Sequence, residues 1–219
     1  MIKKILIVDD HPMVILGYQL ILQHTESVFE MKFDGANTCS EVLLKMKISN
    51  NSFYDLVLLD ISIPSSDCKS ANDGEDLGFY IRKKYPNTKI IVQTGLSDVQ
   101  RITNIFNTLK PDGFIIKPDI NEEVLVNAVE TVLNNKSYFS ESFEKLLSHD
   151  NFEDIYLDNW NRKILYFLSL GYKMKDLPNH LPFSLPTIER RKKEIKLLLG
   201  VQRGGNKELL EVARNKGFV

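Results

Sequence analysis

Five polar side chains directly follow or end short apolar runs, and together they could carry out chemistry. Asp9 and Asp10 follow the first such run, Asp60 ends the third, and Thr94 and Lys117 come at the ends of the last two. Taken singly, each has an ordinary explanation. An aspartate or threonine can cap a loop, and a loop lysine can simply be solvated. Their recurrence at one position relative to the apolar runs favours a shared site.

The three carboxylates and the ammonium suit phosphoryl chemistry if the fold brings them together. Crowded carboxylates repel one another and raise each other's pKa unless a cation lies among them. Acidic oxygen ligands favour a hard ion, and Mg²⁺ in particular takes few protein ligands. With a metal and the Lys117 ammonium nearby, one carboxylate could attack a phosphoryl group, because that transfer depends mainly on positioning and charge neutralisation. Thr94 would offer a hydroxyl to a transferred oxygen.

The apolar pattern of residues 1–133 predicts five strand–helix units that would position these side chains. The predicted strands are Ile5–Val8, Met31–Phe33, Leu56–Leu59, Lys89–Thr94 and Phe114–Ile116. The predicted helices run from Pro12 to about His24, from Ser40 to about Met46, around Leu77–Ile81, from Val99 to Leu109 and from Glu122 to Leu133. This alternation predicts an α/β fold with a five-stranded, parallel, doubly wound sheet of the flavodoxin-like kind. Right-handed crossovers would bring all the strand ends to one edge.

The charge is unevenly distributed along the 219 residues. The formal net charge of the whole chain is -1, yet residues 1–133 carry -5, residues 134–156 carry -3 and residues 157–219 carry +7. An acidic front and a basic back indicate a regulatory or catalytic body joined to a module that meets a polyanion. Chance clustering of solvated charges is the alternative.

Composition favours a cytoplasmic protein that does not enter a membrane. No run approaches the roughly 18 apolar residues of a membrane span. The first residues are better interpreted as a strand than as an export signal, because acids follow the short apolar run at once. The only cysteines, Cys39 and Cys68, lack metal-ligand spacing and fit a reducing cytosol.

Residues 1–133 resemble the receiver domain of two-component response regulators. The matching residues are the pair Asp9-Asp10, Asp60 with Pro64 beyond it, Thr94-Gly95, and the run Phe114-Ile115-Ile116-Lys117-Pro118. The resemblance implies that Asp60 accepts a phosphoryl group from a histidine kinase and that Lys117 pairs with that group. It implies a coupled switch pair, Thr94 and Phe114. It also implies a Lys117–Pro118 peptide bond that is commonly cis.

The same resemblance implies a magnesium site. Its ligands would be Asp9, Asp10, Asp60 and the backbone carbonyl of Ser62. One departure from the receiver pattern lies next to this site, because the loop Ser65–Asp73 is longer than the family's. It is either a tolerated surface insertion, since loop length costs stability only slowly, or a segment that controls access to the acceptor.

The polar residues 134–156 predict a linker, and residues 157–219 predict a small all-α domain of four helices. The predicted helices are Asn159–Leu170 capped by Asp158, Lys175 to about Leu181, Thr187–Leu199 and Lys207–Asn215. The third is the informative one, since Ile188 and Ile195 share a core-facing arc and a basic run lies outside it. A basic helix after a helix and a short turn is typical of helix-turn-helix binding in the DNA major groove. A solvated basic face is the alternative.

Residues 157–219 resemble the LuxR/NarL-type DNA-binding module. The matching residues are Leu170–Leu177, Ser184–Ile188, and Leu199-Gly200-Val201 followed by Glu208-Leu209-Leu210. The candidate DNA contacts are Glu189, Arg190, Lys192, Lys193 and Lys196. The chain departs from the module at Glu189, where a lysine is usual, at Arg191, where a histidine is usual, and in the first helix, which lacks an early acidic residue. The family's sequence preference therefore does not carry over.

Together these features predict a phosphorylation-controlled transcriptional regulator with a receiver at 1–133, a linker at 134–156 and a DNA-binding domain at 157–219. It would need Mg²⁺, a sensor histidine kinase and double-stranded DNA, would be a homodimer when active, and would not be an enzyme beyond slow handling of its own phosphoryl group. One alternative keeps the fold but has an adaptor tail or phosphorylation-independent output. A phosphohydrolase with an aspartyl intermediate is disfavoured, because His11 stands where that chemistry needs an acid two residues after Asp9.

Overall fold

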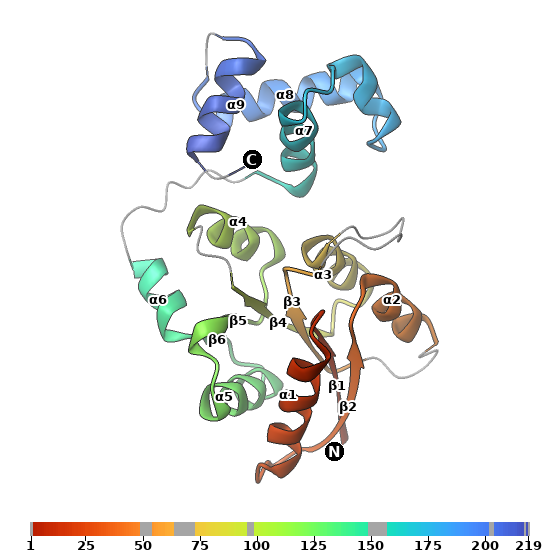
Figure 1. The fold of residues 1–219 in the computed structure, drawn as a ribbon, viewed down its shortest axis with the longest axis vertical. Coiled ribbons are helices and arrows are strands. Elements are labelled where there is room, and N and C mark those ends of the chain that lie inside the picture. The colour runs from red at the N-terminus through yellow and green to blue at the C-terminus, as the bar shows by residue number, and fades with distance from the viewer. Residues whose placement is uncertain are drawn as a thin grey trace. The chain divides into compact units, whose positions relative to one another are not determined.

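The computed structural model describes residues 2–48, 54–63, 73–95, 99–148, 157–201, 204–216 and 218. The chain divides into two compact units. The first contains residues 1–96 and 109–148, and the second contains residues 97–108 and 149–219. Figure 1 shows the elements of both units.

The first unit is built on a six-stranded parallel sheet with the strand order β2-β1-β3-β4-β5-β6. The strands are β1 Ile2–Val8, β2 Glu30–Ala36, β3 Leu56–Asp60, β4 Lys89–Thr94, β5 Gly113–Ile116 and β6 Tyr138–Phe139. The predicted fold class is confirmed, with one correction: the sheet has six strands and not five. The added strand is β6, whose two residues are too few to give a readable alternation.

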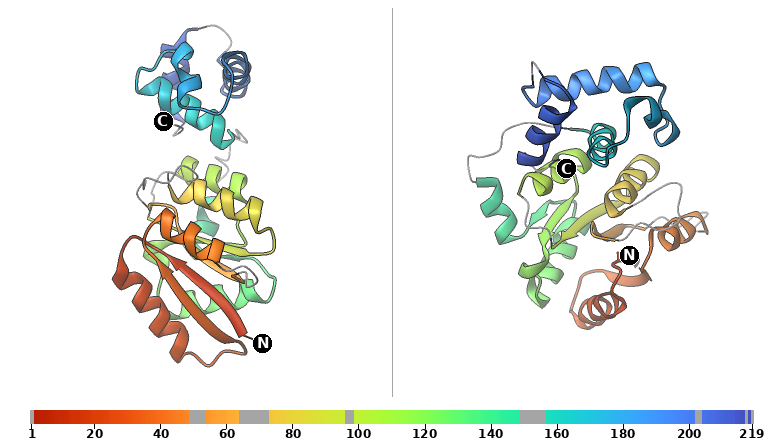
Figure 2. Two further views of the ribbon diagram at one scale, coloured as in Figure 1. Left: turned by 90° about the vertical axis from the view of Figure 1, so that its right-hand side faces the viewer. Right: turned by 45° about the horizontal axis from the view of Figure 1, so that its top comes forward.

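Helices follow the strands along the chain. They are α1 Pro12–His24, α2 Cys39–Ile48, α3 Gly74–Lys84, α4 Val99–Leu109, α5 Glu122–Leu133 and α6 Glu141–Ser148, with a short 3₁₀ turn, η1, at Lys117–Asp119. Figures 1 and 2 show α1 and α5 on one face of the sheet and α2 and α3 on the other. On the first face, α1 and α5 share a hydrophobic core with side chains from β1, β3, β4 and β5. Coverage on both faces explains why all five residues of β3 are buried.

The predicted linker at 134–156 contains folded structure in its first half. β6 pairs in parallel with β5, with Gly113 opposite Tyr138 and Phe114 opposite Phe139. Residues 134–148, including α6, belong to the first unit, and residues 149–156 lie outside the described residues. Phe143 of α6 is 1% exposed, so aromatic side chains attach this segment to the unit. The compact first unit therefore extends beyond residue 133.

The helical bundle of the second unit has the predicted order of elements. It contains α7 Asn159–Ser169, the 3₁₀ helix η2 Met174–Asn179, α8 Leu185–Leu198 and α9 Asn206–Asn215 around one apolar core. The side chain of Asp158 caps α7 by accepting from the Asn161 N–H at 2.7 Å, as predicted. The expected helix at Lys175–Leu181 is instead η2, which contains Pro178, a residue that lacks the N–H needed to continue an α-helix.

None of the helices in the described part of the chain combines the length and apolar character needed to cross a bilayer.

Asp112 fastens the turn that leads into β5. Its carboxylate accepts from the Ile90 N–H at 3.0 Å and forms ion pairs with Arg82 at 2.9 Å and Lys89 at 3.2 Å. Burial raises the pKa of Asp112, but the hydrogen bonds from Ile90, Arg82 and Lys89 outweigh it, so the pKa lies below the ordinary value of 3.8. The carboxylate therefore stabilises the fold above that pH and ceases to do so as the pH falls through its lowered pKa.

We expect Asp112→Asn to lower the free energy of unfolding at pH 7 by about 1–2 kcal/mol, a range reduced for partial exposure. The difference in the free energy of unfolding between the variant and the native chain should shrink as the pH falls below 3.8. Urea denaturation followed by circular dichroism measures both effects. Glu26→Gln removes an exposed carboxylate and is the control; equal effects of the two substitutions would contradict the assignment.

Candidate functional site

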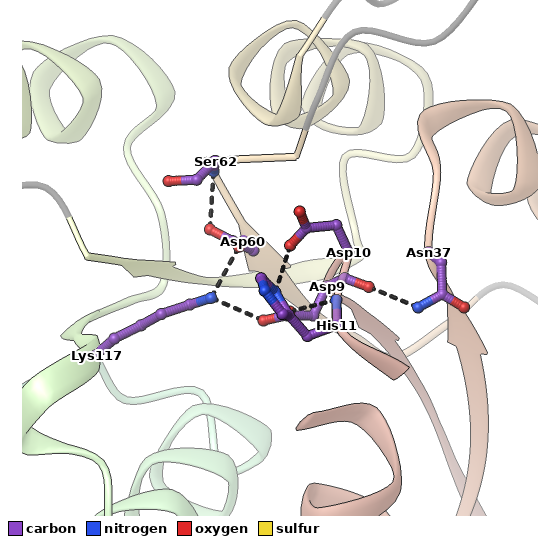
Figure 3. A network of polar contacts seen from close by, with 7 residues as sticks. All are labelled: Asp9, Asp10, His11, Asn37, Asp60, Ser62 and Lys117. Carbon is purple, nitrogen blue, oxygen red and sulfur yellow. Dashed lines mark hydrogen bonds and ion pairs between the residues drawn. The ribbon is translucent and has the colours of Figure 1, made fainter. Parts of the chain in front are cut away.

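The predicted acidic site forms at the carboxyl edge of the sheet. Asp9 follows β1 and is 0% exposed, and Asp60 ends the neighbouring β3 and is 1% exposed. Lys117 arrives from β5, and its Nζ lies 2.8 Å from Asp9 Oδ2 and 2.8 Å from Asp60 Oδ2. Figure 3 shows the ammonium between the two carboxylates. Three strand ends that are distant in sequence thus meet at one cation.

The ammonium of Lys117 is held in its charged form by these contacts. Burial lowers its pKa, but the hydrogen bonds to Asp60 and Asp9 outweigh burial, so the pKa is raised above the ordinary 10.5. One ammonium nevertheless faces two buried carboxylates. Among the residues that the structure describes, the site therefore retains an excess of negative charge, even before Asp10 is counted.

Asp10 lies apart from the lysine and pairs with a residue that was not predicted as part of the site. His11 Nδ1 lies 2.7 Å from Asp10 Oδ1 and 3.3 Å from Asp9 Oδ1. Ligand atoms of Asp9, Asp10 and His11 all lie within 4.8 Å of one another. The signal for His11 was its place directly after the acidic pair, which the sequence analysis had used only to argue against a phosphohydrolase.

A second residue that sequence analysis missed is Asn37. Its Nδ2 donates to the Asp9 carbonyl at 2.9 Å, as Figure 3 shows. β2 runs to Ala36, which pairs with Val8, so Asn37 comes directly opposite Asp9. The predicted strand ended at Phe33, and that early end concealed this pairing.

The backbone beyond β3 contacts Asp60 through an N–H. Ser62 N donates to Asp60 Oδ1 at 2.8 Å. The role of the Ser62 carbonyl as a metal ligand stays a prediction. The first residue of α3, Gly74, comes so close that a Cβ there would lie 2.2 Å from the Asp60 carbonyl oxygen. The intervening loop, with most of the predicted long segment Ser65–Asp73, falls outside the described residues.

The two predicted switch residues lie on β4, the neighbour of β3, and on β5, the next strand of the sheet. Thr94 ends β4, Phe114 lies in β5, and both are 0% exposed. In the parallel register Val92 is opposite Phe114, and Thr94 is opposite Ile116. One expectation taken from the resemblance is wrong: none of the described peptide bonds is cis, so Lys117–Pro118 is trans.

In the second unit, α8 presents three of the five candidate DNA contacts to solvent. Ile188 and Ile195 are both 0% exposed and face the core. Glu189, Arg190 and Lys193 are exposed. The Arg190 side chain is 73% exposed, and its Nε lies 4.0 Å from Glu194 Oε1. An exposed ion pair of this length contributes little to stability, so Arg190 can readily leave Glu194 for another partner.

The other two candidates, Lys192 and Lys196, bind the turn between α8 and α9. Lys192 Nζ donates to the side chain of Asn206, and Lys196 Nζ donates to the carbonyl of Gly204. Burial and the nearby charge of Lys196 lower the pKa of Lys192. Arg191, the departure from the family's histidine, bonds Asp158 at 2.8 Å and also contacts Asn161 and Phe183. These three cations thus have partners within the unit.

A comparison with protein families accounts for the arrangement of the first unit. Residues 5–130 match the family described as the response regulator receiver domain. The chain belongs to the response regulator family. The match includes every receiver-site position identified above, from Asp9 to Lys117.

Two curated response regulators are similar to the chain over almost its whole length. The oxygen regulatory protein NreC of Staphylococcus epidermidis is 28% identical over 232 residues, and 97% of each chain is covered. NreC of Staphylococcus aureus is 26% identical over 227 residues with the same coverage. Response regulators of this kind are regulators and not classical enzymes, which agrees with the predicted absence of substrate turnover.

Solved structures of response regulators share the fold. RcsB of Salmonella enterica serovar Typhimurium, bound to the promoter rprA in the presence of a phosphomimetic, is 23% identical, covers 97% of this chain and 98% of its own, and has a TM-score of 0.64. A complex of the response regulator RcsB with DNA is 22% identical, covers 98% of both chains and has a TM-score of 0.61. At these identities the similarity concerns the fold.

The residues present fit the divalent cation that receivers take up. Asp9 and Asp60 are buried carboxylates that share a single ammonium, and Asp10 adds a third carboxylate beside them. Oxygen donors with excess negative charge are what Mg²⁺ requires. His11, which is 71% exposed, offers a nitrogen that this hard ion disfavours. The response regulator thus has an acidic cluster suited to Mg²⁺.

We expect Lys117→Met to destabilise the first unit, because it leaves two buried carboxylates without a cation. The free energy of unfolding should fall by about 2–4 kcal/mol. Adding Asp9→Asn to the same chain should restore part of the loss, because it removes one of the two charges. Urea denaturation at pH 7 tests this cycle, with the exposed Lys136→Met as the control. An unchanged stability for Lys117→Met would show that the ammonium does not neutralise the pair.

Proposed function

We propose that this response regulator accepts a phosphoryl group on Asp60 and, in that state, controls transcription through a DNA-binding module at 157–219. The observation that carries the proposal is the contact of Lys117 with both Asp9 and Asp60 at 2.8 Å. Such a constellation neutralises developing charge at a carboxylate nucleophile. Response regulators receive their phosphoryl groups from histidine kinases, so a sensor kinase is the partner at this site.

The proposed transfer uses Asp60 as the nucleophile. A carboxylate oxygen of Asp60 forms a bond to phosphorus as the bond between phosphorus and the kinase histidine nitrogen breaks, and the nitrogen keeps the electron pair. Lys117 then donates to a phosphoryl oxygen in place of its direct bond to Asp60. Asp9, Asp10, Asp60 and the Ser62 carbonyl would hold Mg²⁺, which supplies positive charge to the phosphoryl oxygens. Ser62 N, already 2.8 Å from Asp60 Oδ1, orients the carboxylate.

The proposed switch runs from Asp60 to β5. The hydroxyl of Thr94 donates to the new phosphoryl oxygen, and Phe114 moves into the space that Thr94 vacates. Both side chains are fully buried, so neither can move without changing the packing around it. A buried pair with two alternative arrangements is the bistable element that such regulation requires.

The proposed DNA surface is the exposed face of α8 in a LuxR/NarL-type module. Arg190 and Lys193 are exposed on this face, and residues 157–219 carry a net charge of +7. The structural neighbours include RcsB bound to DNA and RcsB dimers on DNA, which supports DNA as the ligand and a homodimer as the active form. A dimer that binds two adjacent half-sites has a higher affinity than a monomer, and its geometry sets the spacing of the half-sites.

The alternative is an output that does not depend on phosphorylation, or a tail that binds a protein. Two observations favour it: Glu189 adds a negative charge to the exposed face of α8, and Lys192 and Lys196 already bind the α8–α9 turn. Both reduce the positive charge available to phosphates. The two experiments below separate this alternative from the main proposal.

Acetyl phosphate and Mg²⁺ should phosphorylate the native chain at Asp60 alone. Intact-mass and peptide mass spectrometry should find one added phosphoryl group, absent from Asp60→Asn and strongly reduced in Lys117→Met. Asp112→Asn, which removes a carboxylate at the opposite edge of the sheet, should be phosphorylated normally. Phosphorylation of Asp60→Asn at the native rate would refute the acceptor assignment.

Arg190→Ala and Lys193→Ala should each weaken binding to promoter DNA by about fivefold to a hundredfold and reduce the dependence of binding on salt. Lys196→Ala should weaken it less and instead destabilise the second unit, since Lys196 binds Gly204. Arg214→Ala, an exposed cation on α9, is the matched control. Gel shifts at several salt concentrations, with and without phosphorylation, measure these effects. Equal DNA binding by the native chain and Asp60→Asn after acetyl phosphate treatment would favour phosphorylation-independent output.

A further inference from the structure

The segment after α5 is fastened to β5, which carries Phe114 and leads directly into Lys117. β6 extends the sheet along β5, and the Ser140 N–H donates to the Phe114 carbonyl at 3.0 Å. The Ser140 hydroxyl then accepts from the Ile116 N–H at 3.1 Å in a fully buried hydrogen bond. Residues 138–140 thus follow β5 almost to Lys117.

α6 is tied a second time, directly beyond Lys117. Asp119 lies two residues after the lysine in η1, and its carboxylate accepts from Ser142 N at 3.0 Å and from Ser142 Oγ at 2.6 Å. Because Ser142 is in the first turn of α6, Asp119 caps this helix from the outside. The lysine that contacts Asp60 is therefore two residues away from an anchor of α6.

The third attachment is an aromatic stack. The rings of Phe114 and Phe143 lie 4.3 Å apart with an interplanar angle of 14°. Phe139 contacts Phe143 at 5.5 Å. Phe114 is 0% exposed and Phe143 is 1% exposed, and a close-packed interior transmits displacement because it has no free volume to absorb it. Phe114 therefore cannot change its position unless Phe143 also moves.

We infer that Phe143 and Ser142 of α6 are positioning residues of the phosphorylation switch, holding Phe114 and the Lys117 turn in the arrangement in which Lys117 bonds Asp60 directly. This inference rests on the proposed role of Asp60. Phosphorylation replaces the direct Lys117–Asp60 contact and, in the proposed switch, moves Phe114, so it acts on the Ser142 and the Phe143 attachments of α6 at once. α6 ends at Ser148, and the chain continues from it to the second unit. A change in α6 would therefore be passed along the backbone toward the second unit.

A positioning role for Phe143 has a thermodynamic consequence that a purely structural role in the core does not have. If the Phe114–Phe143 stack favours the arrangement with the direct Lys117–Asp60 contact, its loss must tighten the binding of a phosphoryl analogue by the same factor. A residue that only supports the core would lower stability and leave that affinity unchanged. Phe143→Leu keeps an apolar side chain but loses the stack, so it tests this distinction.

The test uses the full chain with Mg²⁺ and beryllofluoride as the probe. Phe143→Leu should bind beryllofluoride about twofold to tenfold more tightly than the native chain, the factor that corresponds to an aromatic pair. Ser142→Ala, which removes one hydrogen bond to Asp119, should act in the same direction by about twofold. Phe33→Leu, a half-buried phenylalanine on β2 that packs on the core, is the matched control and should bind like the native chain.

A second measurement starts from the native chain. Beryllofluoride should speed amide hydrogen exchange in α6 at least threefold and leave exchange in α2 unchanged. Thr94→Ala should abolish this effect while still binding the probe. The inference is overturned if exchange in α6 does not respond, or if Phe143→Leu and Phe33→Leu bind the probe equally. Failure of the native chain to bind beryllofluoride would instead refute the proposed role of Asp60.

Discussion

The first unit depends on one ammonium placed between two buried carboxylates. Asp9 and Asp60 are almost completely removed from water, a state that costs several kcal/mol per ion unless a counter-charge is near. Lys117 supplies that charge at 2.8 Å from both. The ends of β1, β3 and β5 must therefore stay in register for the fold to be stable. Among the described residues, the same arrangement leaves one negative charge unbalanced, and this imbalance suits a divalent metal ion.

β5 connects this charged site to the segment that follows α5. It carries Phe114 and is followed directly by Lys117, and residues 138–143 bind along it through the backbone, a hydroxyl and a ring. Chemistry at the strand tips and packing at the sheet edge thus act on the same four-residue strand. A short strand with a close-packed neighbour is a suitable place for an all-or-none change, because its few contacts rearrange together.

The sequence predicted the sheet and the meeting of Asp9, Asp60 and Lys117, because apolar runs and their polar ends are local patterns with a strict topological consequence. It did not predict β6, because two residues carry no periodicity. Asn37 was missed because its place depends on the register of β1 and β2. Helical periodicity placed Glu189, Arg190 and Lys193 correctly on the exposed side of α8. It could not show that Lys192 and Lys196 would bind the next turn, since that depends on tertiary structure. A count of basic residues therefore overstates the charge that α8 offers to a ligand.

The close approach of Gly74 to the Asp60 carbonyl also bears on which changes this chain can accept between β3 and α3. Because β3 and α3 meet at a contact that only glycine can make, the position of the acceptor is fixed independently of the residues that join the two elements. Under the proposed role of Asp60 as the acceptor, a change in the length of that connection would leave the acceptor in place. Loop length would then be a means of tuning access to the acceptor that is separate from its chemistry.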